Sequence, residues 1–182
     1  MDEKTRFYLR HWRLLSEWAA LRGGAVREIT AAVDNAVGTL DAAILAEAEH
    51  VWVARPPDTH PTFELRRPSW QRDEVHAAIA LQWKPAELLT EADPWPYVGV
   101  RVKGLRYLAR NGFVKTMTKQ LETYAKQLGW SGSQIESGWL WWRQVPPTGT
   151  DDDLGSLTAE CRIALEHGWR ELSGPLDDLF GA

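Results

Sequence analysis

The sequence is poor in cysteine and has no long run of apolar residues. Its one cysteine, Cys161, excludes an internal disulfide, and its place in an apolar helical stripe indicates a buried small hydrophobe rather than a reactive thiol. No apolar run approaches the roughly 18–20 residues that a bilayer-spanning helix needs. The charged start, Met-Asp-Glu-Lys, is not followed by the apolar region of a secretory signal. Together these absences predict a cytoplasmic protein with no membrane partner.

The residue spacings that accompany common metal and catalytic sites are also missing. A zinc site needs cysteines and histidines at short spacing, and the five histidines are scattered. There is no glycine-rich phosphate-binding loop and no Gly-x-Ser-x-Gly nucleophile turn. Because no nucleophile can be paired with a base, the sequence favours a binding protein over an enzyme and implies no cofactor.

The overall composition is that of a single globular domain, with an unusual number of tryptophans. The 182 residues are 44% hydrophobic and 25% charged, and we expect one domain over residues 1–182. Eleven of the residues are tryptophan. Tryptophan is a large core residue and is also enriched where proteins bind one another. We expect most of the eleven to lie in the core.

Apolar residues at three- and four-residue steps indicate helices, and strict alternation indicates strands. At the start of the chain, Phe7, Leu14 and Trp18 belong to one apolar stripe. Gly23-Gly24 then predicts a break between two helices, which would fold as an antiparallel hairpin over residues 1–49. The expected helices are 5–22, 25–48, 112–128 and 151–180, and the expected strands are 51–55, 62–67, 75–83, 97–103 and 138–145.

This order of elements predicts an α+β fold. An N-terminal helical hairpin would precede a mixed, mostly antiparallel sheet of four or five strands within residues 50–145, and a helix would follow it. Short turns join the middle strands, so these should pair as antiparallel neighbours. The helix at 112–128 separates the strands at 97–103 and 138–145. It therefore predicts a right-handed β-α-β crossover that makes those two strands parallel.

The succession of helix, antiparallel meander, crossover helix and final strand over residues 25–145 resembles the PD-(D/E)XK nuclease superfamily. The resemblance implies Mg²⁺ held by an aspartate and by an acid-x-Lys triplet. The nearest triplets are Gln82-Trp83-Lys84 and Arg101-Val102-Lys103, which carry an amide and a guanidinium in place of the acid. In this interpretation the candidate metal-site residues are Asp73, Glu74 and Lys84, with Glu64 as a further carboxylate.

Charge is segregated along the chain. The whole chain has a net charge of −4, whereas Val100 to Trp130 contains seven basic residues and one acid, Glu122. Such a segment favours an anionic partner or nucleic acid, with Tyr107 placed to stack on a base. The alternative is a solvated helix, or one that faces the acidic C-terminal helix. The basic residues are Arg101, Lys103, Arg106, Arg110, Lys115, Lys119 and Lys126.

Two tryptophans lie in proline-rich loops. Trp70 follows Pro68, and Trp95 lies between Pro94 and Pro96. A rigid loop that presents tryptophan is a good anchor for a partner protein, so we predict Trp70, Trp95 and Tyr107 as partner-binding residues. The alternative is a tryptophan folded back over the edge of the sheet.

The sequence favours a non-catalytic module that binds another macromolecule, above all a protein, in the manner of an inhibitor or adaptor. The alternative is a PD-(D/E)XK-like, Mg²⁺-dependent nuclease or a nucleic-acid-binding protein that uses the basic segment 101–126. A third interpretation, a glycan or small-molecule binder, would use the tryptophans of the last strand, Trp139, Trp141 and Trp142.

Overall fold

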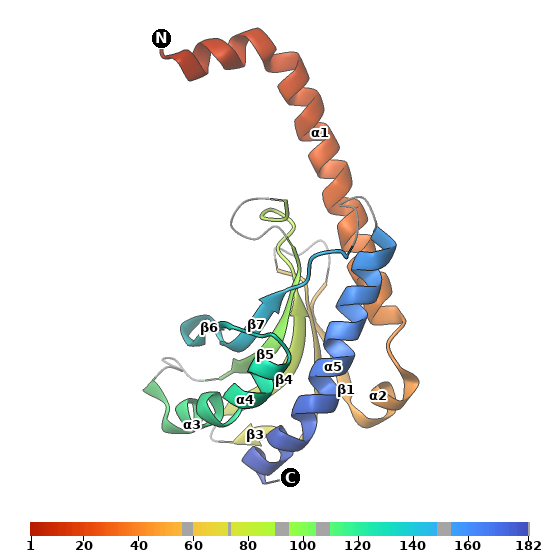
Figure 1. Ribbon diagram of the computed structural model, residues 1–182, viewed down its shortest axis with the longest axis vertical. Helices are drawn as coiled ribbons and strands as arrows, with labels where there is room; N and C mark the ends of the chain where they lie inside the picture. The colour runs from red at the N-terminus through yellow and green to blue at the C-terminus, as the bar shows by residue number, and fades with distance from the viewer. Residues whose placement is uncertain (56–59, 73, 90–94, 105–109, 149–153, 182) are drawn as a thin grey trace.

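The computed structural model describes residues 1–55, 60–72, 74–89, 95–104, 110–148 and 154–181 (Figure 1). A long helix lies at each end of the chain, with a sheet between them. The helices are α1 (Glu3–Gly38), α2 (Ala42–Glu47), α3 (Gly112–Gln120), α4 (Glu122–Gln127) and α5 (Leu154–Phe180), with a short 3-10 turn, η2 (Ile135–Ser137). The strands are β1 (Glu49–Ala54), β2 (Thr62–Arg66), β3 (Gln71–Arg72), β4 (Val75–Gln82), β5 (Tyr97–Lys103), β6 (Gly132–Gln134) and β7 (Trp139–Gln144).

The described strands form one sheet in the order β1-β2-β4-β5-β7-β6, and the short β3 pairs with β4. Every described pair of neighbours is antiparallel. The α+β class that the sequence predicts is therefore confirmed.

The predicted parallel pairing of the strands at 97–103 and 138–145 is wrong. β5 and β7 are antiparallel, with Tyr97 opposite Gln144 and Val100 opposite Trp141. The difference arises from β6, because β6 also pairs antiparallel with β7 and so runs in the direction of β5. The chain thus crosses from β5 through α3 and α4 to β6, and β7 then turns back between these two strands. A three-residue strand with the sequence Gly-Ser-Gln has no alternation that would reveal it.

The predicted hairpin at the N-terminus is also wrong, because residues 3–38 form the single helix α1. Gly23 and Gly24 lie inside it, and neither has the positive φ of a glycine that ends a helix. Each glycine costs roughly 1 kcal/mol relative to alanine in a helix interior. The apolar stripe keeps its phase through both glycines, so packing of the later turns supports the continuous helix.

One core fills the space between the sheet and the helices. The C-terminal half of α1 packs beside α5, and α5 lies over β4 and β5. Gly168 allows this close approach, because a Cβ atom there would lie 2.9 Å from the ring of Trp130 and 3.1 Å from Ile79. Five of the eleven tryptophans are buried: Trp70, Trp83, Trp130, Trp139 and Trp169.

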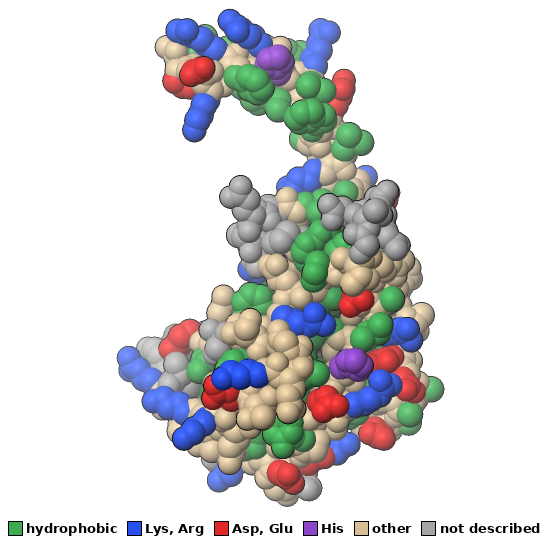
Figure 2. All heavy atoms as spheres, in the orientation of Figure 1, with side chains coloured by type: hydrophobic (Ala, Val, Ile, Leu, Met, Phe, Trp, Pro, Cys, Tyr) green, Lys and Arg blue, Asp and Glu red, His purple; other side chains and the backbone are tan. Residues whose placement is uncertain are grey.

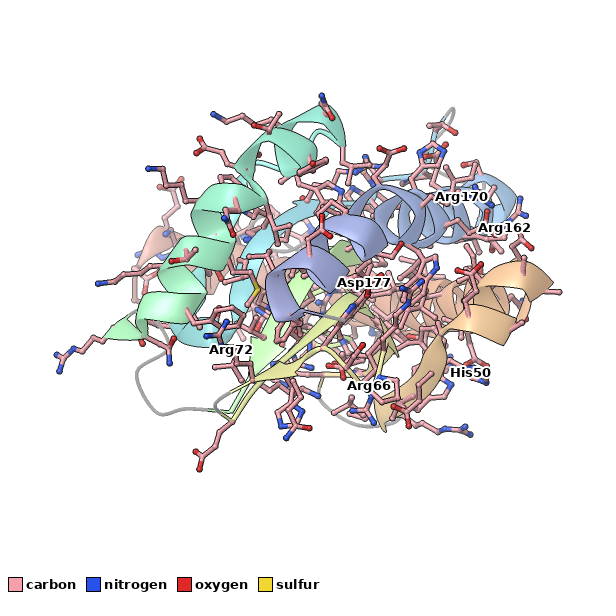
Figure 3. The ribbon with its side chains drawn as sticks, turned by 90° about the horizontal axis from the view of Figure 1, so that it is seen from below. His50, Arg66, Arg72, Arg162, Arg170 and Asp177 are labelled. Carbon is pink, nitrogen blue, oxygen red and sulfur yellow. The ribbon has the colours of Figure 1, made fainter. Side chains whose placement is uncertain are left out.

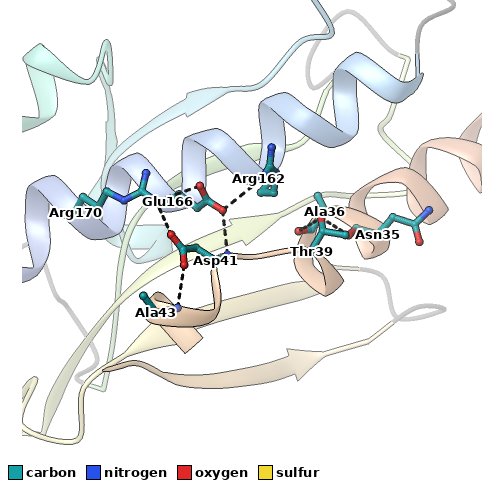
Figure 4. A network of polar contacts seen from close by, with 8 residues as sticks. All are labelled: Asn35, Ala36, Thr39, Asp41, Ala43, Arg162, Glu166 and Arg170. Atoms are coloured by element: carbon teal, nitrogen blue, oxygen red, sulfur yellow. Dashed lines mark hydrogen bonds and ion pairs between the residues drawn. The ribbon is translucent and has the colours of Figure 1, made fainter. Parts of the chain in front are cut away.

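A polar network fixes the corner between α1 and α2 to α5 (Figure 4). The carboxylate of Glu166, which is buried, accepts a hydrogen bond from the backbone N–H of Asp41 at 3.1 Å. It also lies 3.4 Å from Arg170 and 3.9 Å from Arg162. Asp41 in turn accepts from the N–H of Ala43 at 2.9 Å and so caps the start of α2.

None of the described helices is long and apolar enough to cross a membrane.

Candidate interaction surfaces

The N-terminal half of α1 projects from the rest of the molecule (Figure 1). We call residues 3–22 of this helix the arm. All of its residues are exposed except Leu15, which is half-buried. At its base, the guanidinium of Arg22 donates to the carbonyl oxygens of Ala86 and Leu88 at 2.8 and 2.9 Å. At its start, Asp2 accepts from the N–H of Thr5 and caps the helix.

The arm carries large apolar side chains that pack against no other part of the described chain. Phe7 and Trp18 are 58% and 59% exposed, and they lie eleven residues apart, about three helical turns. A further eleven residues lead to Ile29, which is buried in the core. The arm therefore continues the same apolar stripe that α1 buries nearer the sheet. The other large exposed side chains of the arm are Tyr8, Leu9, Trp12, Leu14 and Leu21.

Positive charge accompanies this stripe (Figure 2). Residues 4–16 contain four basic side chains and no acid. The guanidinium of Arg13 lies over the ring of Trp12, 5.5 Å from its centroid. The four basic residues are Lys4, Arg6, Arg10 and Arg13.

The arm is bent (Figure 1). The hydroxyl of Ser16 donates to the carbonyl oxygen of Trp12 at 2.7 Å. A serine that bonds back to the preceding turn in this way often bends a helix. The arm thus has a local cause for its curvature that is independent of any contact with the sheet.

A second surface lies on the face of the sheet that α1, α3, α4 and α5 leave uncovered (Figure 3). Val98, Val100 and Val102 of β5 point into the core, so the alternate residues of β5 point to this open face. A row of four aligned residues, Glu64, Ala80, Gly99 and Trp142, crosses the middle of the sheet. A Cβ atom on Gly99 would lie 2.1 Å from the carbonyl oxygen of Trp141, so only glycine fits there.

The open face has an aromatic half and a charged half. Tyr97, Trp139 and the half-buried Trp142 cover Ala80 in the aromatic half. At one end, the hydroxyl of Tyr97 donates to Gln82, whose amide donates to Thr62. These contacts leave the aromatic half closely packed.

The charged half centres on Glu64, whose side chain is 3% exposed. Its Oε1 atom accepts from Lys103 Nζ at 2.7 Å and from Arg101 Nη1 at 3.1 Å. Burial lowers the pKa of Lys103 below 10.5, and the contact with Glu64 opposes that shift. Arg101 also lies over the ring of Trp139, 5.9 Å from its centroid. Beside them, Arg66 projects on the side away from α5 and pairs with Glu49 at 2.9 Å (Figure 3).

These side chains surround a cleft of about 210 Å³ on the open face. Its walls come from β2, β4 and β5, and Ala78 opposite Arg101 contributes no bulk beyond its Cβ atom. The lining residues are Glu64, Arg66, His76, Ala77, Ala78, Arg101 and Lys103.

The structure divides the predicted basic surface between two layers. Arg101 and Lys103 line the cleft on the open face. Arg110, Lys115, Lys119 and Lys126 are exposed on the helical layer, where Lys126 pairs with Glu122 at 2.6 Å. Arg106 and Tyr107 lie outside the described residues.

The structure does not present Trp70 as an anchor. Trp70 is 1% exposed, its indole donates to Asp177 of α5 at 2.7 Å, and its ring lies 5.2 Å from that of Trp169. It is therefore folded back against the rest of the chain, which is the alternative to a partner-binding role for this tryptophan. Trp95 is half-buried against the same core.

The candidate metal residues are not brought together. Glu74 precedes β4 and Lys84 follows it, so they lie at opposite ends of an eight-residue strand. Glu74 has a φ of 65° in the tight turn before β4, and Lys84 pairs with Glu87 at 2.8 Å. Asp73 lies outside the described residues. The described residues contain no group of three or more His, Cys, Asp or Glu side chains that could hold a metal ion.

The apolar side chains of the arm are the feature that sequence reasoning missed. Their periodicity is visible in the sequence, but the expected hairpin would have covered them.

Comparison with known proteins adds no assignment: no family model matches the chain, and no curated protein and no solved structure matches it significantly.

Proposed function

We propose that this chain is a non-catalytic module that binds another protein through the arm of α1. The observation that carries the proposal is the continuation of a core-forming apolar stripe onto a helix that nothing in the described chain covers. A helix with anchors at three- and four-residue steps suits a hydrophobic groove on a partner. Leu14, Trp18 and Leu21 follow this spacing and Phe7 lies two turns earlier on the same stripe; Phe7 and Trp18 are large, rigid side chains of the kind that contribute most to such binding.

The charge of the arm specifies the chemistry of that groove. The arm has five basic residues and two acids, Glu3 and Glu17, which flank the stretch that contains Lys4, Arg6, Arg10 and Arg13. A partner with carboxylates around its groove would pair with these side chains and would be steered toward the arm. Phe7, Leu14 and Trp18 are 58%, 44% and 59% exposed, so burying the rest of each would contribute only part of the roughly 1.5–3 kcal/mol of complete burial, before the cost of association.

The test is direct binding of a purified partner. Proteins captured from a lysate of the source would be purified and titrated with the full chain by calorimetry. We expect Trp18→Ala to weaken binding at least tenfold and Arg10→Glu to weaken it with a smaller salt dependence. Tyr124→Ala is the matched control, because Tyr124 is an exposed aromatic residue on α4, away from the arm.

Three outcomes would contradict this proposal. The first is a partner that binds the Trp18→Ala and wild-type chains equally. The second is concentration-dependent self-association in sedimentation that Trp18→Ala abolishes, because the arm would then bind a second copy. The third is binding to anionic vesicles that the same substitution abolishes.

Nucleic-acid binding through residues 101–126 is a second proposal. Arg101 and Lys103 support it, because they share the open face with Trp139. Labelled single- and double-stranded DNA and RNA should then bind with an affinity that falls steeply between ~50 and ~200 mM salt. An affinity for nucleic acid that does not change with salt, or no binding at all, would contradict this second proposal. The nuclease version requires Mg²⁺-dependent cleavage that Asp73→Ala, Glu74→Ala and Lys84→Ala abolish.

A further inference from the structure

The cleft on the open face has more cationic than anionic groups. Arg66, Arg101 and Lys103 line it together with His76, and among the described residues of the lining Glu64 is the only carboxylate. Arg101 and Lys103 both contact the same Oε1 atom of Glu64. Even when Glu49, the partner of Arg66, is included, three cations face two carboxylates. Among the described residues that line the cleft and their ion-pair partners, basic side chains therefore outnumber carboxylates.

The same face also contains donors without acceptors. In the described part of the chain, the buried side-chain atoms that lack a hydrogen-bond partner include Arg101 Nε and Trp142 Nε1. Both are N–H donors, and both belong to residues on the open face. A buried donor left without an acceptor costs about 1–3 kcal/mol. Arg101 therefore has donor capacity beyond the Nη1 contact with Glu64.

The volume of the cleft limits the size of the group that it can hold. About 210 Å³ is below the roughly 300–1,000 Å³ of pockets that enclose a whole drug-sized ligand. It suits one small charged group. Guanidinium and ammonium side chains bind phosphate and carboxylate oxygens through short, charge-assisted hydrogen bonds.

We propose that this cleft binds an oxyanion, a phosphate or carboxylate group, through Arg66, Arg101 and Lys103. Glu64 acts as a positioning residue, because it fixes Arg101 and Lys103 beside each other in the absence of the ligand. The oxyanion belongs either to a small molecule or to a nucleic-acid backbone, and both present the same oxygens. This inference uses none of the contacts of the arm, so it stands apart from the binding of a protein partner.

The test measures saturable binding of inorganic phosphate and of acetate to the full chain. Amide NMR shifts and thermal unfolding would be followed in each salt against chloride at equal ionic strength. We expect shifts at β2 and β5 that saturate, and at least a tenfold loss of affinity in Arg66→Gln. Lys119→Gln is the matched control, because Lys119 is exposed on α3. Salts such as phosphate also stabilise proteins non-specifically, so stabilisation without saturation does not count as binding.

Arg66→Gln is preferred to Arg101→Gln because Arg66 pairs with the exposed Glu49 and not with the buried Glu64. The variant should therefore fold. Equal affinity in wild type and Arg66→Gln, or shifts that do not saturate, would overturn the proposal. A single-stranded oligonucleotide then separates the two sources. If it competes with bound phosphate, the oxyanion belongs to nucleic acid; if phosphate remains bound, it belongs to a small molecule.

Discussion

Cys161 shows how one side chain reports the packing of the helical layer. It lies on α5 with no exposed surface, within the core. Burial raises the pKa of its thiol to about 12 from 9.0. The sequence interpretation of a buried small hydrophobe is confirmed, because the apolar neighbours at four-residue steps were sufficient to place it.

We expect Cys161 to resist thiol reagents in the folded protein and to react once the chain is unfolded. Between pH 9 and about 12 the unfolded thiol ionises while the folded one stays protonated, so stability should fall as the pH rises through this range. The rate of labelling by a chromogenic disulfide, with and without urea, measures the first effect. Cys161→Ala should lose that part of the alkaline decline. Fast stoichiometric labelling of the native chain would show that the site is open.

Glu64 and Glu122 both belong to ion pairs but differ in burial. Removing one partner of a buried pair costs about 3–5 kcal/mol, and an exposed pair contributes about 0–1 kcal/mol. Arg101 and Lys103 are partly exposed, so we expect Glu64→Gln to cost about 3 kcal/mol, at the lower end of that range. Glu122→Gln should cost clearly less than Glu64→Gln, because solvent screens the exposed pair with Lys126. Urea unfolding of both variants gives the comparison, and equal losses would contradict it.

The sequence could not predict the role of Glu64. Its strand alternates apolar and charged residues, which predicts only that Glu64 lies on the opposite face from Phe63 and Leu65. Burial of the carboxylate depends on Arg101 and Lys103, which are far away in the sequence. The register of three strands aligns Glu64 with Gly99, and these two side chains reach Glu64 from further along β5. Arg101 and Lys103 were identified as candidate binding residues from charge alone.

At the level of single elements, α1 shows how a local signal can be overridden. A Gly-Gly pair after an apolar stripe is typical of a helix end, yet the stripe resumes in phase beyond it. Short polar segments such as β6 are missed for a different reason, because they have no hydrophobic alternation that would predict a strand. Strongly periodic segments, β4 and α5 among them, were located to within a few residues.

Gly24→Ala distinguishes a continuous helix from a hairpin. A Cβ atom at this position meets nothing within 4 Å. Alanine should therefore raise stability or helix content, by roughly 0.5–1 kcal/mol. Gly138→Ala is the contrasting variant, because Gly138 has a φ of 86° and a Cβ atom there would lie 2.6 Å from the carbonyl oxygen of Val102. Circular dichroism and urea unfolding report both, and destabilisation by Gly24→Ala would indicate a break in the helix.

The molecule consists of the exposed arm, residues 3–22, and the remainder of the chain, which we call the body. The sequence predicted the α+β class and the main core, because periodicity shows which face of an element is apolar. It could not predict that the apolar side chains of the arm are exposed, since periodicity shows which face of a helix is apolar but not what packs against that face.

We expect removal of residues 1–20 to leave the melting temperature of the body within about 2 °C of that of the full chain. The reason is that the side chains of this segment are exposed apart from Leu15, whereas the core begins near Ile29. Differential scanning calorimetry of both chains provides the measurement. A large drop in melting temperature would mean that the arm packs on the body in solution.

The length of α1 has a consequence for whether a ligand bound at the arm changes the affinity of the cleft for its own ligand. With 36 residues and a rise of ~1.5 Å per residue, the path along the axis of this bent helix is about 54 Å long. The tip of the arm is thereby kept at a distance from the sheet. None of the described contacts of the arm reaches a residue that lines the cleft, so we expect no coupling free energy between ligands bound at the two sites. Each should therefore be bound with the same affinity whether or not the other is present.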